Sequence, residues 1–161
     1  YAYPLQVLAD VIGGGASSRL YRKLVVEDEV AVSAGAYYSG AGNGPGRFTF
    51  YASPRGDVSL EALEENVEKE IEKLVKNGIT GEELRRAKSR MHASAVYARD
   101  SLSGAARSLG SSLAVGIPVV EVEAWPERIE AVTLPQILEA AASTFNEQRS
   151  VTGLLLPKVK P

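Results

Sequence analysis

Apolar residues recur every three or four positions at the start of the chain, which predicts a helix over residues 5–12. Three successive glycines, Gly13 to Gly15, end this helix. A second, shorter helix carrying Leu20 and Leu24 is expected after them, with a serine at 17 or 18 as its cap. The chain therefore opens with two helices joined by a tight turn.

Three shorter stretches have the composition of β-strands. Residues 30–38 are rich in Val, Ala, Ser and Tyr, and residues 47–52 are aromatic and β-branched. A glycine-rich loop over 39–46 separates them. Residues 151–156, ended by a proline, predict a last, buried strand.

The middle of the chain is dominated by helical patterns. Residues 60–76 form a long amphipathic pattern whose outer faces are charged. Capping boxes, in which a Thr and a Glu or Gln satisfy each other's free backbone donors, begin at Thr80 and at Thr133. Further apolar stripes predict helices over 84–98, 102–113, 125–132 and 137–145. Asp100 and Ser101 can cap the second of these helices.

This order of elements predicts an α+β fold, with a mainly antiparallel sheet and helices packed on one of its faces. Residues 1–161 are expected to form a single domain, because no linker or repeat divides them. Three strands are few for so much helix, so one or two strands are expected upstream of Tyr1. The chain does not begin with Met, and we interpret it as a fragment of a longer polypeptide.

Composition excludes several classes of function. The 18 basic and 20 acidic residues give a net charge of -2, which argues against a nucleic-acid partner. There is no cysteine and only one histidine, His92, so a zinc site here would need Asp or Glu for every other ligand. No apolar run is long enough to span a membrane.

The remaining candidate residues each have a structural explanation that we favour. Gly13 to Ser18 resembles a phosphate-binding loop only weakly, since a helix rather than a strand precedes it. The basic residues Arg19, Arg22 and Lys23 suit a solvated helix face. The aromatic residues of the two strands, which could stack on a ligand, are more typical of a core and a sheet surface; they are Tyr37, Tyr38, Phe48 and Tyr51. The residues themselves therefore predict no catalytic and no metal-binding group in this domain.

The order of short motifs resembles the second, inactive domain of pitrilysin/insulinase-type zinc peptidases, and most closely that of short bacterial members. The resemblance covers nearly the whole chain. It rests on Leu8 to Gly15, Ser17 to Arg22, Ala31 to Ala34, Gly78 to Leu84 with Ala87-Lys88, Asp100-Ser101, Trp125, Ile129 to Thr133 and Val151 to Gly153.

The resemblance implies a larger zinc metalloendopeptidase in which this domain is not catalytic. Zinc would lie in an N-terminal domain of the same chain that carries the H-x-x-E-H motif, where the metal activates water and the Glu acts as general base. The domain described by this sequence would hold no cofactor. It would pack beside the catalytic domain and wall a chamber for the peptide substrate. A periplasmic location is suggested by the bacterial resemblance only.

Two positions depart from the family pattern. Members whose second domain assists catalysis have an Arg and, seven residues later, a Tyr, which hold the substrate and help stabilise the oxyanion. Here these positions fall on Val25 and Val32, neither of which can donate a hydrogen bond. The resemblance then implies a homodimer or a heterodimer with a related subunit that supplies the Arg/Tyr pair.

Two other functions stay open at this point. The chain could belong to a purely structural assembly subunit of the same family, in which the upstream zinc motif is degraded. It could also be an unrelated α+β module that binds a small molecule, in which case a deep polar pocket is expected near Gly13 to Ser18.

Overall fold

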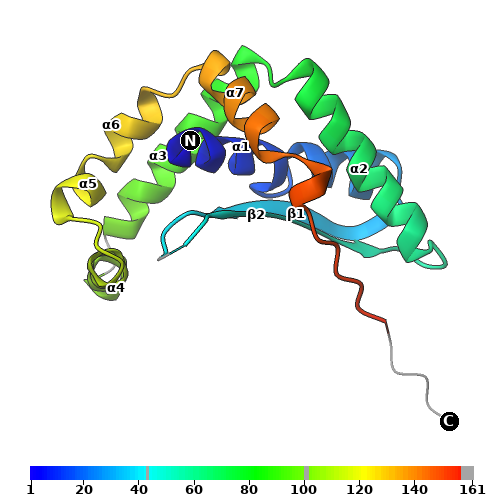
Figure 1. The fold of residues 1–161 in the computed structure, drawn as a ribbon, viewed down its shortest axis with the longest axis horizontal. Coiled ribbons are helices and arrows are strands. Elements are labelled where there is room, and N and C mark those ends of the chain that lie inside the picture. The colour runs from blue at the N-terminus through cyan, green and yellow to red at the C-terminus, as the bar shows by residue number, and fades with distance from the viewer. Residues whose placement is uncertain (43, 100–101, 157–161) are drawn as a thin grey trace, which may run out of the picture.

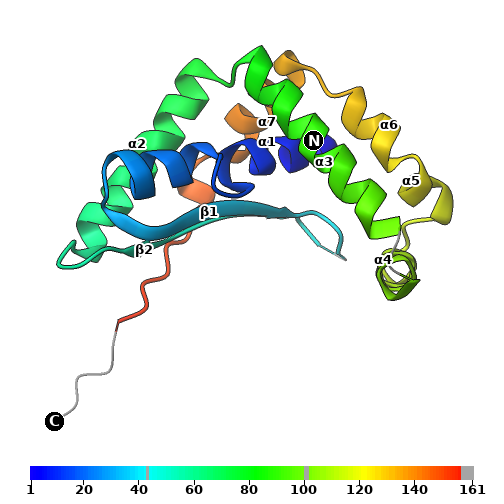
Figure 2. The ribbon, with the colours of Figure 1, turned by 180° about the vertical axis from the view of Figure 1, so that it is seen from behind.

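The computed structural model describes all residues except 43, 100–101 and 157–161. It is an α+β fold in which the helices lie on one face of an antiparallel sheet, as predicted (Figure 1). The helices arch over the sheet, and its opposite face is left uncovered by them (Figures 1 and 2).

In the described part of the chain the sheet has two strands, β1 (Ala31–Ser39) and β2 (Arg47–Pro54). They pair antiparallel, with Tyr38 opposite Phe48 and Ala36 opposite Phe50. Since side chains alternate along a strand, these residues share the face that meets the helices. Both strands begin and end within two residues of the predicted bounds.

The helices follow the predicted order, with two short additions, α5 and η2. Their bounds are α1 (Ala2–Gly13), η1 (Tyr21–Glu27), α2 (Leu60–Asn77), α3 (Gly81–Arg99), α4 (Leu102–Ala114), α5 (Val119–Glu123), α6 (Trp125–Glu130), α7 (Leu134–Thr144) and η2 (Glu147–Arg149). The short helix η1 is a π-helix, and no serine side chain caps it. Both predicted capping boxes are present, at Thr80 and at Thr133.

The core lies between α1 and the sheet. Leu8 of α1, Leu20 and Leu24 around η1, and Ile137 of α7 are fully buried there. At its last residue, Gly13, α1 touches β1 so closely that a Cβ atom would overlap the backbone of Ala36. Gly13 is therefore required by the packing of helix against strand as well as by the turn that follows.

The prediction of a third, buried strand over residues 151–156 is wrong for this structure. These residues have no regular secondary structure, and their four large apolar side chains are 51–97% exposed. A strand needs a neighbour to accept and donate its main-chain hydrogen bonds. None of the described residues provides such a neighbour for this segment.

The inward face predicted for α3 holds except at its last member, Ala98. Ala87 is buried, and Leu84, Met91 and Ala95 are partly buried, whereas Ala98 is exposed. The second half of α3 extends past the sheet and meets α4 instead (Figure 2). The predicted cap of α4 at positions 100 and 101 lies outside the described residues.

Candidate functional site

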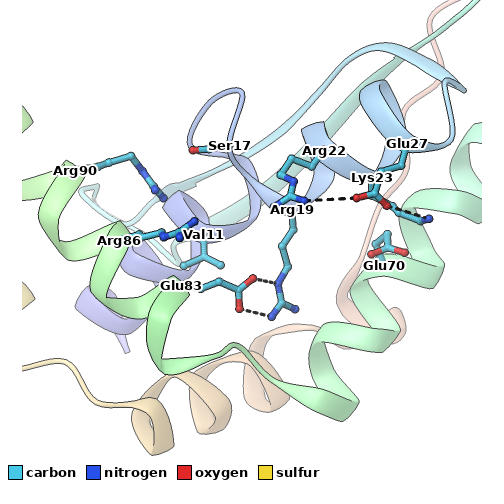
Figure 3. A pocket seen from close by; sticks show the side chains of 10 residues that line it. All are labelled: Val11, Ser17, Arg19, Arg22, Lys23, Glu27, Glu70, Glu83, Arg86 and Arg90. Atoms are coloured by element: carbon cyan, nitrogen blue, oxygen red, sulfur yellow. Dashed lines mark hydrogen bonds and ion pairs between the residues drawn. The ribbon is translucent and has the colours of Figure 1, made fainter.

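A small cavity of about 240 Å³ lies beside the glycine turn, between α1, η1, α2 and α3 (Figure 3). It is the place where the charged residues singled out in the sequence come together. Its lining consists of Val11, Ser17, Arg19, Arg22, Lys23, Glu27, Glu70, Glu83, Arg86 and Arg90. Basic side chains outnumber acidic ones in this lining, so an anion would bind here if any of them were unpaired.

Arg19 is held by Glu83 through a two-pronged ion pair. Its Nε and Nη2 donate to the two carboxylate oxygens at 2.5 and 2.6 Å (Figure 3). Both side chains are 29% exposed, so water screens the pair only in part. Arg19 therefore differs from the solvated face expected from sequence, because it joins the glycine turn to α3, 64 positions further along the chain.

The same Glu83 carboxylate also caps the N-terminus of helix α3. It accepts hydrogen bonds from the backbone nitrogen of Thr80 at 2.7 Å and from the Thr80 hydroxyl at 2.9 Å. Burial by itself would raise the pKa of Glu83, but the hydrogen bonds from Arg19 and Thr80 outweigh it and lower the pKa to about 2. Glu83 is thus ionised over the whole ordinary pH range.

A second ion pair ties α1 to α3 on the other side of the cavity. Arg90 donates from Nε and Nη2 to one oxygen of Asp10, at 3.1 and 2.5 Å. Burial raises the pKa of Asp10, and the hydrogen bonds and charge of Arg90 offset only part of that rise. Asp10 serves here as the partner of Arg90.

The other basic side chains around the cavity are also paired. Lys23 lies 2.8 Å from Asp28, Arg22 lies 3.8 Å from Glu27, and Arg86 lies 2.7 Å from Glu82. The cavity is therefore a network of compensated charges, which does not favour the interpretation of Gly13 to Ser18 as a phosphate-binding loop. The basic side chains that a small-molecule-binding module would need in this pocket are already engaged in ion pairs within the protein.

The two valines at the family's Arg/Tyr positions lie in different environments. Val25 is 7% exposed and packs in the hydrophobic core, while Val32 on β1 is 56% exposed. The backbone carbonyl of Val25 accepts a hydrogen bond from Arg55 at 3.2 Å, and Arg55 also pairs with Glu29 in the turn before β1. Neither valine side chain brings a polar group to the surface, and their assignment to the family positions stays a prediction.

The aromatic residues of the hairpin divide between the two faces of the sheet. Phe48 packs inward, with its ring centre 4.9 Å from that of Phe145, the residue that follows α7. Tyr37 and Tyr51 face outward, 6.5 Å apart between ring centres, and both are about half exposed. The uncovered face of the sheet therefore carries an aromatic pair.

His92, the single histidine, lies on an exposed part of α3. Among the described residues, no group of three or more His, Cys, Asp or Glu side chains is placed to hold a metal ion. The residues described here thus do not fit a zinc site, although the expectation that the domain binds no metal stays a prediction. No helix in the described part of the chain is both long and apolar enough to cross a membrane.

Replacing Glu83 with Gln should lower the free energy of unfolding at neutral pH by about 1–3 kcal/mol, the usual range for hydrogen bonds to a charged group. Because the folded-state pKa of Glu83 is lowered to about 2, the carboxylate stabilises the fold fully above its ordinary pKa of 4.5 and progressively less as the pH falls toward 2. Urea denaturation of both proteins across this range measures the difference, which should shrink between pH 4.5 and 2.

The matched control is the neighbouring Glu82→Gln. Among the described residues, Glu82 pairs with Arg85 and Arg86 on the exposed side of α3, where water and salt weaken the interaction. Its replacement should cost much less than that of Glu83. Equal losses for the two variants, or a Glu83 effect that does not change with pH, would show that the ion pair with Arg19 does not stabilise the turn.

Comparison with known proteins shows which protein family and which relatives this chain resembles. A family model described as the peptidase M16 inactive domain matches residues 1–91. An uncharacterized zinc protease of Rickettsia felis is 29% identical over 144 residues, which are 89% of this chain and 34% of that protein. The zinc protease YmxG of Bacillus subtilis, also uncharacterized, is 30% identical over 146 residues, 90% of this chain and 35% of that protein. The chain thus spans about a third of the length of these relatives.

Solved structures show the same fold. An inactive peptidase domain from Bordetella parapertussis superposes with a TM-score of 0.87 at 20% identity, covering 99% of this chain and 83% of that one. A protease from Helicobacter pylori superposes with a TM-score of 0.83 at 23% identity, covering 91% of this chain and 35% of that one. At these identities the likeness concerns the fold.

Proposed function

Because this chain belongs to the family of peptidase M16 inactive domains, we propose that it is the non-catalytic C-terminal domain of a zinc metallopeptidase. In this proposal an N-terminal domain of the same polypeptide holds the zinc and hydrolyses the peptide. The domain described here walls the substrate chamber and provides packing surfaces for its neighbours. The family match over residues 1–91 is the observation that carries the proposal.

The architecture of the sheet supports a role as a wall. Helices cover one face, whereas the other face is free of them and carries Tyr37 and Tyr51 (Figure 1). Tyrosines at a surface combine a large apolar area with a hydrogen-bonding hydroxyl, a combination that suits contact with peptides of varied sequence. In our proposal this open face borders the chamber.

The proposal also assigns partners. The N-terminal catalytic domain is the first of them, and the ion-paired charges described above leave packing rather than chemistry to this domain. Since Val25 and Val32 offer no hydrogen-bond donor, a second subunit that carries the Arg/Tyr pair would complete the peptidase. That arrangement makes the active form a dimer, with a peptide as substrate.

The full-length protein tests the proposal. We expect it to carry about one zinc ion per chain and to cleave unstructured peptides in the presence of its partner subunit. Chelation of the metal should abolish cleavage, and added zinc should restore it. A full-length chain that binds no zinc and cleaves no peptide even with the partner would instead identify a structural assembly subunit.

Replacing both Tyr37 and Tyr51 with Ala in the same full-length protein tests the role of the open face. If this face contacts the peptide, KM should rise about tenfold, in line with the loss of aromatic contacts in other peptide interfaces, while zinc content stays the same. The matched control is Val120→Ala on α5, another exposed apolar residue, which lies away from the sheet. An unchanged KM in the double variant would place the substrate elsewhere.

A further inference from the structure

The β1–β2 hairpin is almost free of charge. Residues 30–54 carry a single charged side chain, Arg47, and no Asp or Glu, although 24% of the residues in the whole chain are charged. The solvated face of an antiparallel sheet is ordinarily polar, and charged side chains discourage other chains from adding to it. The open face of this hairpin lacks most of those charges, so it is better suited to contact another molecule than to stay in water.

Arg47 lies on the open face together with the two exposed tyrosines. It is the first residue of β2, and Tyr37 of β1 pairs in register with Thr49, two positions further along. Side chains alternate along a strand and match across it, so Arg47, Thr49, Tyr51 and Tyr37 share one face. Diagonal neighbours of this kind are roughly 7–8 Å apart, which puts Arg47 and Tyr37 within reach of one ligand.

The two tyrosines form a low aromatic surface beside Arg47. Their ring centres are 6.5 Å apart, and both side chains are about half exposed. Tyr51 lies across Gly35 of β1, where a Cβ atom would come within 2.5 Å of the tyrosine hydroxyl oxygen. Because Gly35 has no side chain, the Tyr51 ring rests against the sheet, and an extended peptide can pass over it.

Arg47 differs from the arginines of the cavity because it has no partner. It is exposed, and no group among the residues that the structure describes accepts a hydrogen bond from its side chain or pairs with its charge. Arg19 and Arg90, by contrast, are each held by a carboxylate. A guanidinium beside aromatic rings, with no acidic residue on either strand, is complementary to a carboxylate that another molecule brings.

We propose that the open face selects peptides that carry an acidic side chain near an aromatic or large apolar one. The acidic group would pair with Arg47, and the apolar side chain would lie on Tyr37 and Tyr51. An extended peptide advances about 3.3 Å per residue and alternates its side chains, so the two groups should be two or four positions apart. This inference rests on the proposed function, in which the same face borders the substrate chamber, and it adds a substrate class.

A peptide suits this face better than a second copy of the chain. In a symmetric dimer the same surface meets itself, so Arg47 of one copy would meet a face that offers a second Arg47 and no carboxylate. Only a ligand that brings its own acidic group satisfies the charge of this face.

Peptide binding to the zinc-free, full-length protein tests the inference without cleavage. The probe is Gly-Ser-Phe-Ala-Asp-Ala-Ser-Gly with an uncharged fluorophore at its N-terminus and an amidated C-terminus, so that only the Asp side chain carries charge. We expect Kd to be about five- to tenfold lower than for the same peptide with Asn in place of Asp, and the Lys version to bind most weakly. Equal Kd values for the three peptides would overturn the proposal.

Charge reversal at Arg47 shows whether this residue makes the selection. Arg47→Glu should invert the order, so that the Lys peptide binds best, whereas Arg47→Lys should keep the Asp peptide first. The matched control is Lys76→Glu, an exposed cation in the last turn of α2 on the helical side of the sheet, which should leave the order unchanged (Figure 1). A preference for the Asp peptide that survives Arg47→Glu would refute the assignment.

Cleavage assays separate this inference from the proposed function. With zinc and the partner subunit present, the Asp peptide should have the highest kcat/KM, chiefly through a lower KM. Equal kcat/KM for the three peptides would refute the acidic preference and leave the peptidase proposal standing. Selective binding of the Asp peptide by a chain that holds no zinc and cleaves nothing would support the role of Arg47 and refute the peptidase proposal.

Discussion

Addition of a partner subunit that carries the Arg/Tyr pair should raise peptide cleavage by the full-length parent chain on the order of 10²–10³-fold, the effect of one lost oxyanion donor in other enzymes. The reason lies in Val25 and Val32, which can neither donate a hydrogen bond nor carry charge. In the structure Val25 is buried in the core, so its side chain is not available at the surface. In the two-subunit proposal the donors come from another chain. Titration of the purified partner into the parent chain, with peptide cleavage as the readout, measures the effect.

The control is a partner whose Arg and Tyr are replaced by Ala and Phe. It should bind the parent chain equally well, as analytical ultracentrifugation would show, and leave cleavage at the basal rate. A parent chain that is fully active by itself would refute the two-subunit model. Inserting the pair into this domain is a poor substitute for the experiment, since Val25→Arg would place a guanidinium in the core.

Gly13→Ala should destabilise the domain by about 3 kcal/mol or more. The added Cβ would overlap the backbone nitrogen and Cα of Ala36, and backbone atoms at the centre of a strand cannot move aside as a flexible side chain can. Either α1 or β1 would have to shift, and the core between them contains Leu8. Chemical denaturation of the full-length protein, followed by a probe within this domain, gives the change in free energy of unfolding.

Gly110→Ala is the matched control for this change. Gly110 lies inside α4, and a Cβ there meets nothing within 4 Å. Alanine is the better helix former, so this variant should be unchanged or more stable by about 0.5–1 kcal/mol. A loss of less than about 1 kcal/mol for Gly13→Ala would mean that helix and strand separate more easily than the structure indicates.

Local signals in the sequence were sufficient for most of the fold. The capping box at Thr80 and the apolar stripe of α2 depend on residues three or four positions apart, and both elements formed where they were expected. The hairpin was predictable for the same reason, since its strands are neighbours in sequence. The structure of residues 151–156 could not be predicted in this way, because a strand forms only with a partner strand and none of the described residues pairs with this segment.

The candidate site shows the same division. The sequence identified Arg19 and Glu83 separately, one in a basic cluster and the other in a capping box. Their ion pair could not be predicted, because it depends on how the turn after α1 lies against α3 in the folded domain. The sequence shows which charged residues are present, whereas the partner of each charge depends on the tertiary packing.

The double use of the Glu83 carboxylate has a kinetic consequence. Its bond to Thr80 closes over three positions and can form early, whereas its bonds to Arg19 close a loop of 64 and must wait until α1 and α3 have met. Interactions made after the transition state slow unfolding more than they speed folding. We therefore expect the bonds of Glu83 to Arg19 to slow unfolding of the domain, and its bond to Thr80 to contribute to the rate of folding.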